Sequence, residues 1–132
     1  MFSLSKKADY GLIALKHLAQ HSDESVSARE IAKQYRIPAE MLAKILQKLA
    51  RKGILLSHHG TNGGYVLARD PSQISIVDVV EAIEGPIGIT PCERGTECQQ
   101  MDVCSVRDPL RKLKAKVVRV LGDTSIYELA VN

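Results

Sequence analysis

The sequence predicts a mainly α-helical protein with one small β-hairpin. Three observations indicate this fold class: apolar residues recur at helical spacing in several segments, capping residues precede these segments, and a glycine-rich stretch separates two short β-prone runs. The chain has 132 residues, of which 45% are hydrophobic. This is enough for one domain with its own core and excludes a second large domain.

The first helix is predicted to follow Ser3 or Ser5, either of which can cap it. His17 and His21 lie four residues apart on this helix, a spacing that can bind a metal ion. Because no third ligand lies near them in the sequence, we interpret both as surface residues. The apolar positions of the helix are Leu4, Ala8, Leu12, Leu15 and Ala19.

The second and third helices are predicted on either side of a tight turn. An S-x-x-E capping box, Ser27 and Glu30, starts a short helix, and Pro38 follows its end because the residue before proline leaves the helical region. The third helix ends at Gly53. The apolar positions of the two helices are Ile31, Ala32 and Tyr35, then Leu42, Ile45, Leu46 and Leu49.

A hairpin is predicted next. The runs ILLSHH at residues 54–59 and YVLAR at residues 65–69 are β-prone, and they flank the stretch GTNGG. Glycine and asparagine tolerate the positive φ angles that tight hairpin turns require.

Three more helices are predicted beyond the hairpin. Ser75 can cap the first of them, and Asp108 and Pro109 suit the cap and first position of a long helix with Gly122 after it. The segment SIYELA, residues 125–130, predicts a short last helix. No period is visible from Gly85 to Cys104. The apolar positions are Ile76, Val79, Val80 and Ile83 on the first, and Leu110, Leu113, Val117 and Leu121 on the long helix.

The positive charge is concentrated in the N-terminal half. Residues 1–70 contain 11 Lys and Arg against 6 Asp and Glu, a net charge of +5, whereas residues 71–132 contain 7 against 9, a net charge of −2. The basic half is a candidate surface for a polyanion. With one Phe, four Tyr and no Trp, the chain offers few aromatic platforms for unpaired bases, so we expect duplex DNA as the partner.

Two helices joined by a tight turn and followed by a hairpin describe a winged helix-turn-helix, whose second helix enters the major groove. Lys44 and Gln47 can hydrogen-bond base edges, whereas Lys48, Arg51 and Lys52 suit phosphates. The small residues of the hairpin tip predict a close approach to a partner. The candidate DNA contacts are Arg29, then Glu40, Ala43, Lys44, Gln47, Lys48 and Arg51 on the outward face of the third helix, and His59, Gly60, Thr61, Asn62 and Gly63 in the hairpin.

All three cysteines, Cys92, Cys98 and Cys104, lie six residues apart in one polar stretch. Zinc sites bring cysteines in closer pairs, whereas iron–sulfur clusters are held by thiolates at wider spacings. The cysteines therefore predict a cluster-binding loop, in which one ligand position is left for another group. The nearby carboxylates that could fill it are Glu93, Glu97, Asp102 and Asp108.

The chain resembles a known family. The segments GLIALKHLA, LAKILQKLARKGILLSHHGTNGGYVLAR and ISIVDVVEAIEGP, with the three spaced cysteines, resemble the Rrf-type bacterial regulators that include the iron–sulfur regulators IscR and NsrR. The stretches EGPIGITPCE, CSVRDP and TSIYELA look most like the subgroup that regulates the SUF cluster-assembly operon.

The resemblance implies a homodimeric winged-helix regulator that is dimerised through the long last helix. A 2Fe-2S or 4Fe-4S cluster on the cysteine loop would control its affinity for a palindromic DNA operator. NsrR-type members take a fourth ligand from an aspartate of the first helix of the other subunit, and Asp9 stands at the matching position. The implied division is residues 1–84 for DNA binding, 85–108 for the cluster loop, and 109–132 for the dimerisation helix and a short last helix.

Two positions depart from the family pattern. IscR-type proteins carry a histidine ligand where this chain has Arg107, and arginine does not give up its proton to bind iron. The wing residue before Gly60 is commonly arginine in the family but is His59 here, so its positive charge depends on pH.

Three further expectations follow. Nitric-oxide sensing of NsrR type is the first rival function, and a cluster carrier or redox protein that docks on an acidic partner is the second. An enzyme is not expected, because no nucleophile and base fall in a recognisable arrangement. No apolar run approaches the roughly 18 residues that cross a bilayer, and the N-terminus lacks a signal peptide, so we expect a cytoplasmic protein without membrane contact.

Overall fold

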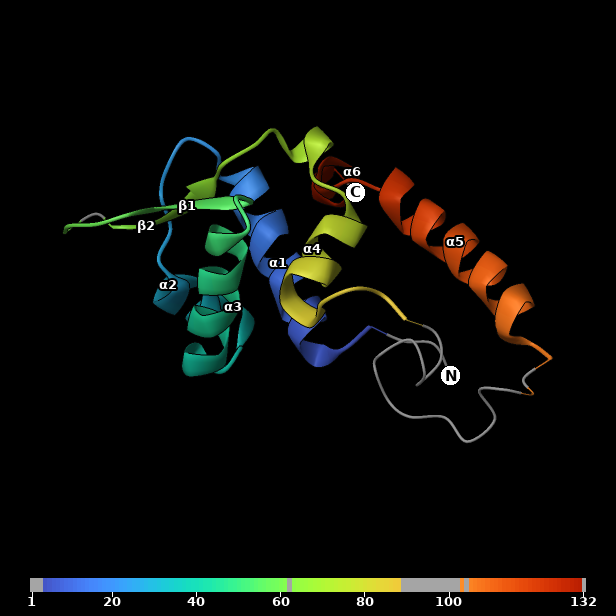
Figure 1. The fold of residues 1–132 in the computed structure, drawn as a ribbon. Coiled ribbons are helices and arrows are strands. Elements are labelled where there is room, and N and C mark those ends of the chain that lie inside the picture. The colour runs from blue at the N-terminus through green and yellow to red at the C-terminus, as the bar shows by residue number, and fades with distance from the viewer. Residues whose placement is uncertain (1–3, 62, 89–102, 104, 132) are drawn as a thin grey trace.

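A computed structural model of the chain describes residues 4–61, 63–88, 103 and 105–131. The hairpin projects from one end of the molecule and α5 lies at the other end, with α1, α3 and α4 between them (Figure 1). The elements in chain order are α1 (Lys6–Gln20), α2 (Ala28–Tyr35), α3 (Ala39–Arg51), β1 (Leu55–His58), β2 (Gly64–Leu67), the 3-10 helix η1 (Pro71–Gln73), α4 (Ile76–Glu84), α5 (Arg107–Asp123) and α6 (Ile126–Val131). This confirms the mainly α-helical fold with one antiparallel hairpin.

Serine caps set the starts of α1, α2 and α4. The Ser5 and Ser27 hydroxyls accept from the amides of Ala8 and Glu30, each at 3.1 Å. The full reciprocal box forms at α4, where Ser75 and Asp78 exchange two bonds of 3.1 Å. At α1 the cap is Ser5, so Leu4 lies before the helix and is 41% exposed rather than on its buried face.

The start and end of α5 differ from the prediction. The helix begins at Arg107 and continues to Asp123, so Asp108 and Pro109 lie inside its first turn and Gly122 lies within the helix. Proline is tolerated there because a first-turn N–H has no intrahelical acceptor. The amide of Leu110 donates to the carbonyl of Val106 at 2.9 Å, which fixes the earlier start.

The core lies between α1, α3 and α4, and α6 completes it. Ile126 is fully buried, and its amide donates to the carbonyl of Ile74 at 2.8 Å. The Gln20 side chain donates to the carbonyl of Ala130 at 3.0 Å, which joins α6 to the end of α1. The predicted apolar stripes of α3 and α4 are buried: Leu42, Ile45, Leu46 and Leu49, and Ile76, Val79, Val80 and Ile83. Within the described ranges, no helix has the length and apolar character needed to cross a membrane.

The hairpin is fastened to the segment before α2. Val26 and Tyr65 exchange two backbone hydrogen bonds, of 3.1 Å from the Val26 amide and 2.8 Å from the Tyr65 amide. The strands pair from Leu55 opposite Leu67 to His58 opposite Gly64. The wing is thereby tied to the start of α2 as well as to the end of α3.

The glycines of the hairpin tip make room for the chain itself. A Cβ on Gly63 would lie 2.7 Å from the His58 carbonyl oxygen, and a Cβ on Gly64 would lie 2.5 Å from the Val26 carbonyl carbon. Gly60 has a φ of +114°, which side chains rarely adopt. The chain's own backbone therefore approaches Gly63 and Gly64 closely, and the approach of the hairpin tip to a partner stays a prediction.

His17 is buried, which corrects its interpretation as a surface residue. It is 5% exposed, its Nδ1 lies 2.8 Å from the Tyr35 hydroxyl, and its ring stacks on His21 with centroids 4.1 Å apart. Because Tyr35 is the last residue of α2, this contact fixes the end of α2 on α1. The sequence did not indicate this burial, because His17 and Tyr35 are 18 residues apart and meet only in the folded chain.

The free energy of unfolding should fall as the pH falls below 6.5. Burial, followed by the neighbouring His21, lowers the pKa of His17 from its ordinary value of 6.5, and Glu24 and Glu30 only partly oppose this. The unfolded chain therefore takes up the proton first, and acid favours unfolding. We expect His17→Gln to reduce the slope of stability against pH between about 7 and 5, as measured by urea unfolding. An unchanged slope in this variant would contradict the assignment to His17.

Candidate nucleic-acid interface and cysteine segment

The turn between α2 and α3 sets the angle of the third helix. Arg36 caps α2 in the left-handed conformation, with a φ of 57°, and the amide of Ile37 donates to the carbonyl of Ala32 at 2.9 Å. Ile37 is 5% exposed and therefore anchors the turn in the core. Pro38 then occupies the cap position of α3.

The outward face of α3 is as predicted from the spacing of its apolar residues. Glu40, Lys44, Gln47, Lys48 and Arg51 are exposed, and Ala43 is half-buried. The face carries three cations, one amide and one carboxylate, opposite a stripe of four buried aliphatic side chains. Cationic and amide side chains of this kind bind phosphates and base edges.

The ammonium group of Lys48, on this exposed face, has a partner in the protein. Its Nζ donates to the carbonyl of Ile83 in the last turn of α4, at 3.4 Å. Lys52, just after α3, lines an open pocket of about 390 Å³ together with Asp78 and Glu81 of α4. Lys48 and Lys52 therefore adjoin α4.

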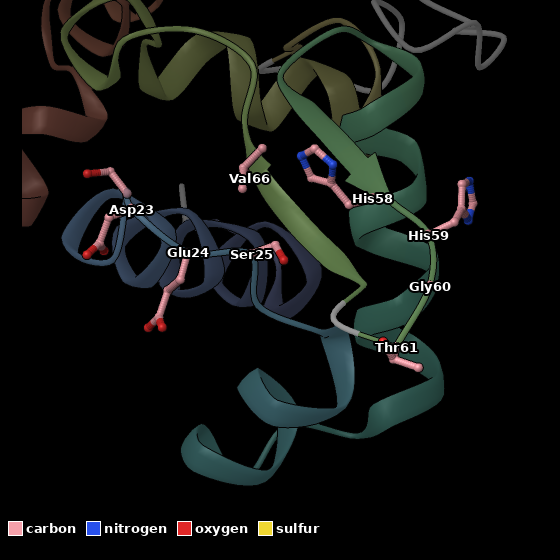
Figure 2. Close-up of a pocket in the computed structure, with 9 residues that line it drawn as sticks. Asp23, Glu24, Ser25, His58, His59, Gly60, Thr61 and Val66 are labelled. Atoms are coloured by element: carbon pink, nitrogen blue, oxygen red, sulfur yellow. The ribbon is translucent and has the colours of Figure 1, made fainter.

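The hairpin tip places His59, Gly60 and Thr61 in solvent and Gly63 in a half-buried position, while Asn62 lies outside the described residues. An open pocket of about 550 Å³ separates the hairpin from the turn after α1. In Figure 2 the His59 ring projects from the far side of the hairpin relative to Asp23 and Glu24. His59 nevertheless lines this pocket together with Asp23 and Glu24.

Arg29 is exposed in the first turn of α2. The first amides of a helix lack intrahelical acceptors, and the helix dipole favours anions at this end. Arg29 therefore lies where a phosphate would be favoured.

Cys92, Cys98 and Cys104 lie outside the described residues, as do three of the four carboxylates that could add a ligand, Glu93, Glu97 and Asp102. Asp108 is exposed in the first turn of α5, and Asp9 is exposed in the first turn of α1. Within the described ranges, no three His, Cys, Asp or Glu side chains are arranged to hold a metal ion.

The first turn of α1 and the entry to the cysteine segment lie side by side. The hydroxyl of Ser5, the cap of the helix that carries Asp9, donates to the carboxylate of Glu84. Glu84 ends α4, and Cys92 follows it by eight residues. This contact spans 79 residues of sequence, and no local pattern indicates it.

The helix α5 leaves apolar side chains in solvent. Leu113 is 48% exposed and Val120 is 64% exposed, and none of the residues of α5 is fully buried. Figure 1 shows α5 extending away from the other helices. Apolar side chains spaced seven residues apart on one helix form a stripe that a second helix can cover.

Comparisons with known proteins match this geometry. The model of the Rrf2 family, described as an iron-dependent transcriptional regulator, matches residues 4–132. The chain is 30% identical over 130 residues to the HTH-type transcriptional regulator IscR of Xenorhabdus nematophila, and the match covers 98% of this chain and 79% of that protein.

Two solved structures extend the comparison. CymR, the global cysteine regulator of B. subtilis, superimposes with a TM-score of 0.80 and 28% identity, covering 99% of this chain and 98% of that one. The IscR of T. potens superimposes with a TM-score of 0.76 and 26% identity, covering 97% and 85%.

Proposed function

The chain belongs to the Rrf2 family of iron-dependent transcriptional regulators, and on this premise we propose that it senses an iron–sulfur cluster and controls cluster-assembly genes of SUF type. It is a transcription regulator and not an enzyme. The observation that carries the proposal for DNA binding is the exposed, mostly basic face of α3, beside a hairpin that is fastened to α2.

In the proposed complex, α3 lies in the major groove and the hairpin follows the flank. Lys44 and Gln47 contact base edges, and Arg51 and Arg29 contact phosphates. Glu40 and Ala43 lie at the start of α3, where they face the groove and limit which bases fit. His59 to Gly63, with Asn62 among them, form the wing contact.

The proposed cluster ligands are Cys92, Cys98 and Cys104, with Asp9 of the partner subunit as the fourth. Three thiolates suit either a 2Fe-2S or a 4Fe-4S centre. The exposure of Asp9 supports this role, because a second subunit can reach its carboxylate. When bound, the cluster would link the three thiolates to one another. Oxidation of the cluster or loss of its iron would remove this link. A carboxylate holds iron less firmly than a thiolate does, which suits a sensor.

A homodimer follows from the exposed stripe of α5, which we propose as the contact between two copies. We assign residues 1–84 to DNA binding, 85–108 to the cluster and 109–132 to the dimer helix and the last helix. A two-fold dimer reads a palindromic operator, and the compartment is the cytoplasm.

Replacing Arg51 with methionine should weaken binding to the operator and reduce its salt dependence. Each lost phosphate contact lowers the slope of log affinity against log salt by about 0.9, and a dimer loses two contacts. Gel-shift titrations at several salt concentrations measure both quantities. The control is Lys112→Met in α5, which removes an exposed cation and should leave the slope unchanged. Equal slopes for the two variants would contradict the docking of α3.

The function itself is tested with the anaerobically purified protein, with and without its iron. Sequence-specific binding that differs between the two forms is expected, whereas no specific binding in either form would favour the cluster-carrier function.

Two other signals have specific support. Arg107 and Asp9 favour nitric oxide, and the likeness to CymR favours cysteine. Adding nitric oxide, cysteine or a cluster-accepting apoprotein, and following DNA release, separates these signals from cluster supply.

A further inference from the structure

The last turn of α4 is held from two other helices. Ser5 at the start of α1 contacts Glu84, and Lys48 of α3 contacts the carbonyl of Ile83. Ile83 itself is 5% exposed. The chain leaves this turn at Gly85 and runs toward Cys92. The contacts therefore surround the point where the cysteine segment begins.

The contact of Lys48 has a clear physical cause. The last four carbonyls of a helix have no intrahelical donor, and cations are favoured at this end of the helix dipole. The amide of Gly85 satisfies the carbonyl of Glu81 at 2.9 Å. The ammonium group of Lys48 serves the carbonyl of Ile83 in the same way, at 3.4 Å.

Apolar packing holds Ile83 at the same place. A Cβ on Gly11 would lie 2.4 Å from Cδ1 of Ile83 and 3.5 Å from Cγ2 of Ile45. The absence of a side chain at Gly11 therefore lets α1, α3 and α4 meet closely. Ile45 and Lys48 are less than one turn apart on α3. Ile45 therefore lies beside Gly11 at this close approach, and Lys48 contacts the carbonyl of Ile83.

We propose that Lys48 is a positioning residue, which fixes α3 against the last turn of α4 and carries a displacement of the cysteine segment to the DNA-binding helix. The part of this inference that concerns the cysteine segment rests on the proposed cluster-sensing function. The part that concerns the position of α3 does not. Lys48 thus has a different role from Arg51, although both lie on the exposed side of the helix.

Salt dependence separates positioning from phosphate contact. An ammonium group has three hydrogens, so Lys48 retains donors that a phosphate could accept, and geometry alone does not distinguish the roles. A lysine that meets a phosphate releases counterions, and its loss lowers the slope of log affinity against log salt. A lysine that only positions α3 changes affinity without changing this slope.

The test compares Lys48→Met with Arg51→Met in the full-length protein, with and without iron, on operator DNA. We expect Lys48→Met to keep the salt slope of the wild type and to bring the ratio between the affinities of the holo and apo forms about threefold closer to one. Arg51→Met should lower the slope and leave the ratio unchanged. Circular dichroism and thermal unfolding verify that both variants are folded.

Two results would overturn the proposal. One is a salt slope that falls as far in Lys48→Met as in Arg51→Met. The other is a Lys48→Met protein with the DNA affinity and the holo-to-apo affinity ratio of the wild type. A wild-type ratio of one would instead refute cluster sensing. In that case a Lys48→Met protein with the wild-type salt slope but altered DNA affinity would still support the positioning of α3 by Lys48. Failure of cluster sensing is thus distinguishable from failure of the role of Lys48.

Discussion

Replacing Cys98 with alanine is expected to remove the visible absorption of the anaerobically purified protein and the dependence of its DNA affinity on iron. Cys98 is the middle thiolate of three, and a cluster that loses it keeps two thiolates, too few to be retained. The fold should not change, because the core formed by the described residues runs from Ala8 to Ile83 and is completed by Ile126. Iron and sulfide analysis, the visible spectrum and circular dichroism measure these effects.

The matched control for this prediction is Gln99→Ala, which changes the neighbouring residue and removes no thiolate. It should retain the iron content, the spectrum and the DNA response of the wild type. A colourless wild-type protein, or a Cys98→Ala protein with the wild-type spectrum, would contradict the assignment of the cluster to these cysteines.

Replacing Gly64 with alanine should separate the hairpin from α2 and destabilise the protein by about 3 kcal/mol, through overpacking and the loss of two hydrogen bonds. The added Cβ would lie 2.5 Å from the carbonyl carbon of Val26, 2.6 Å from its oxygen and 2.8 Å from the amide nitrogen of Ser27. These are backbone atoms, which cannot rotate away. Relief requires breaking the two hydrogen bonds between Val26 and Tyr65.

Urea unfolding measures the loss of stability, and a gel-shift titration measures the accompanying loss of DNA affinity. The control is Gly122→Ala in α5, where an added Cβ meets no atom within 4 Å. Alanine is the better helix former, so this variant should be stabilised by about 0.5–1 kcal/mol. If Gly64→Ala were as stable as the wild type, the hairpin would not depend on this close contact.

The sequence alone determined the features that depend on a few neighbouring residues. The serine caps at Ser27 and Ser75 and the turn at Gly53 were predictable because each involves groups within one helical turn. At the first helix the sequence left Ser3 and Ser5 open, and the structure has Ser5 as the cap. The buried and exposed faces of α3 follow from the 3.6-residue period in the same way. The candidate DNA-binding face was therefore visible in the sequence.

The local sequence pattern did not predict features that depend on groups distant in the sequence. His17 and His21 lie on a helix, as their sequence positions predict. Whether His17 is exposed or buried, however, depends on its contact with Tyr35 in another helix. The glycines of the hairpin tip indicate a close approach, but only the structure identifies Val26 as the group that approaches Gly64.

Tertiary structure also decided which exposed cation of α3 contacts another helix. Lys48 and Arg51 both lie on the exposed face of α3, and the helical period does not indicate that Lys48 donates to the last turn of α4, 35 residues away in the sequence. The physical reason is that helical periodicity fixes a side chain's direction around its own axis, whereas the groups it meets depend on how the helices pack. The composition of the DNA-binding face is thus local information, and its connection to the cysteine segment is not.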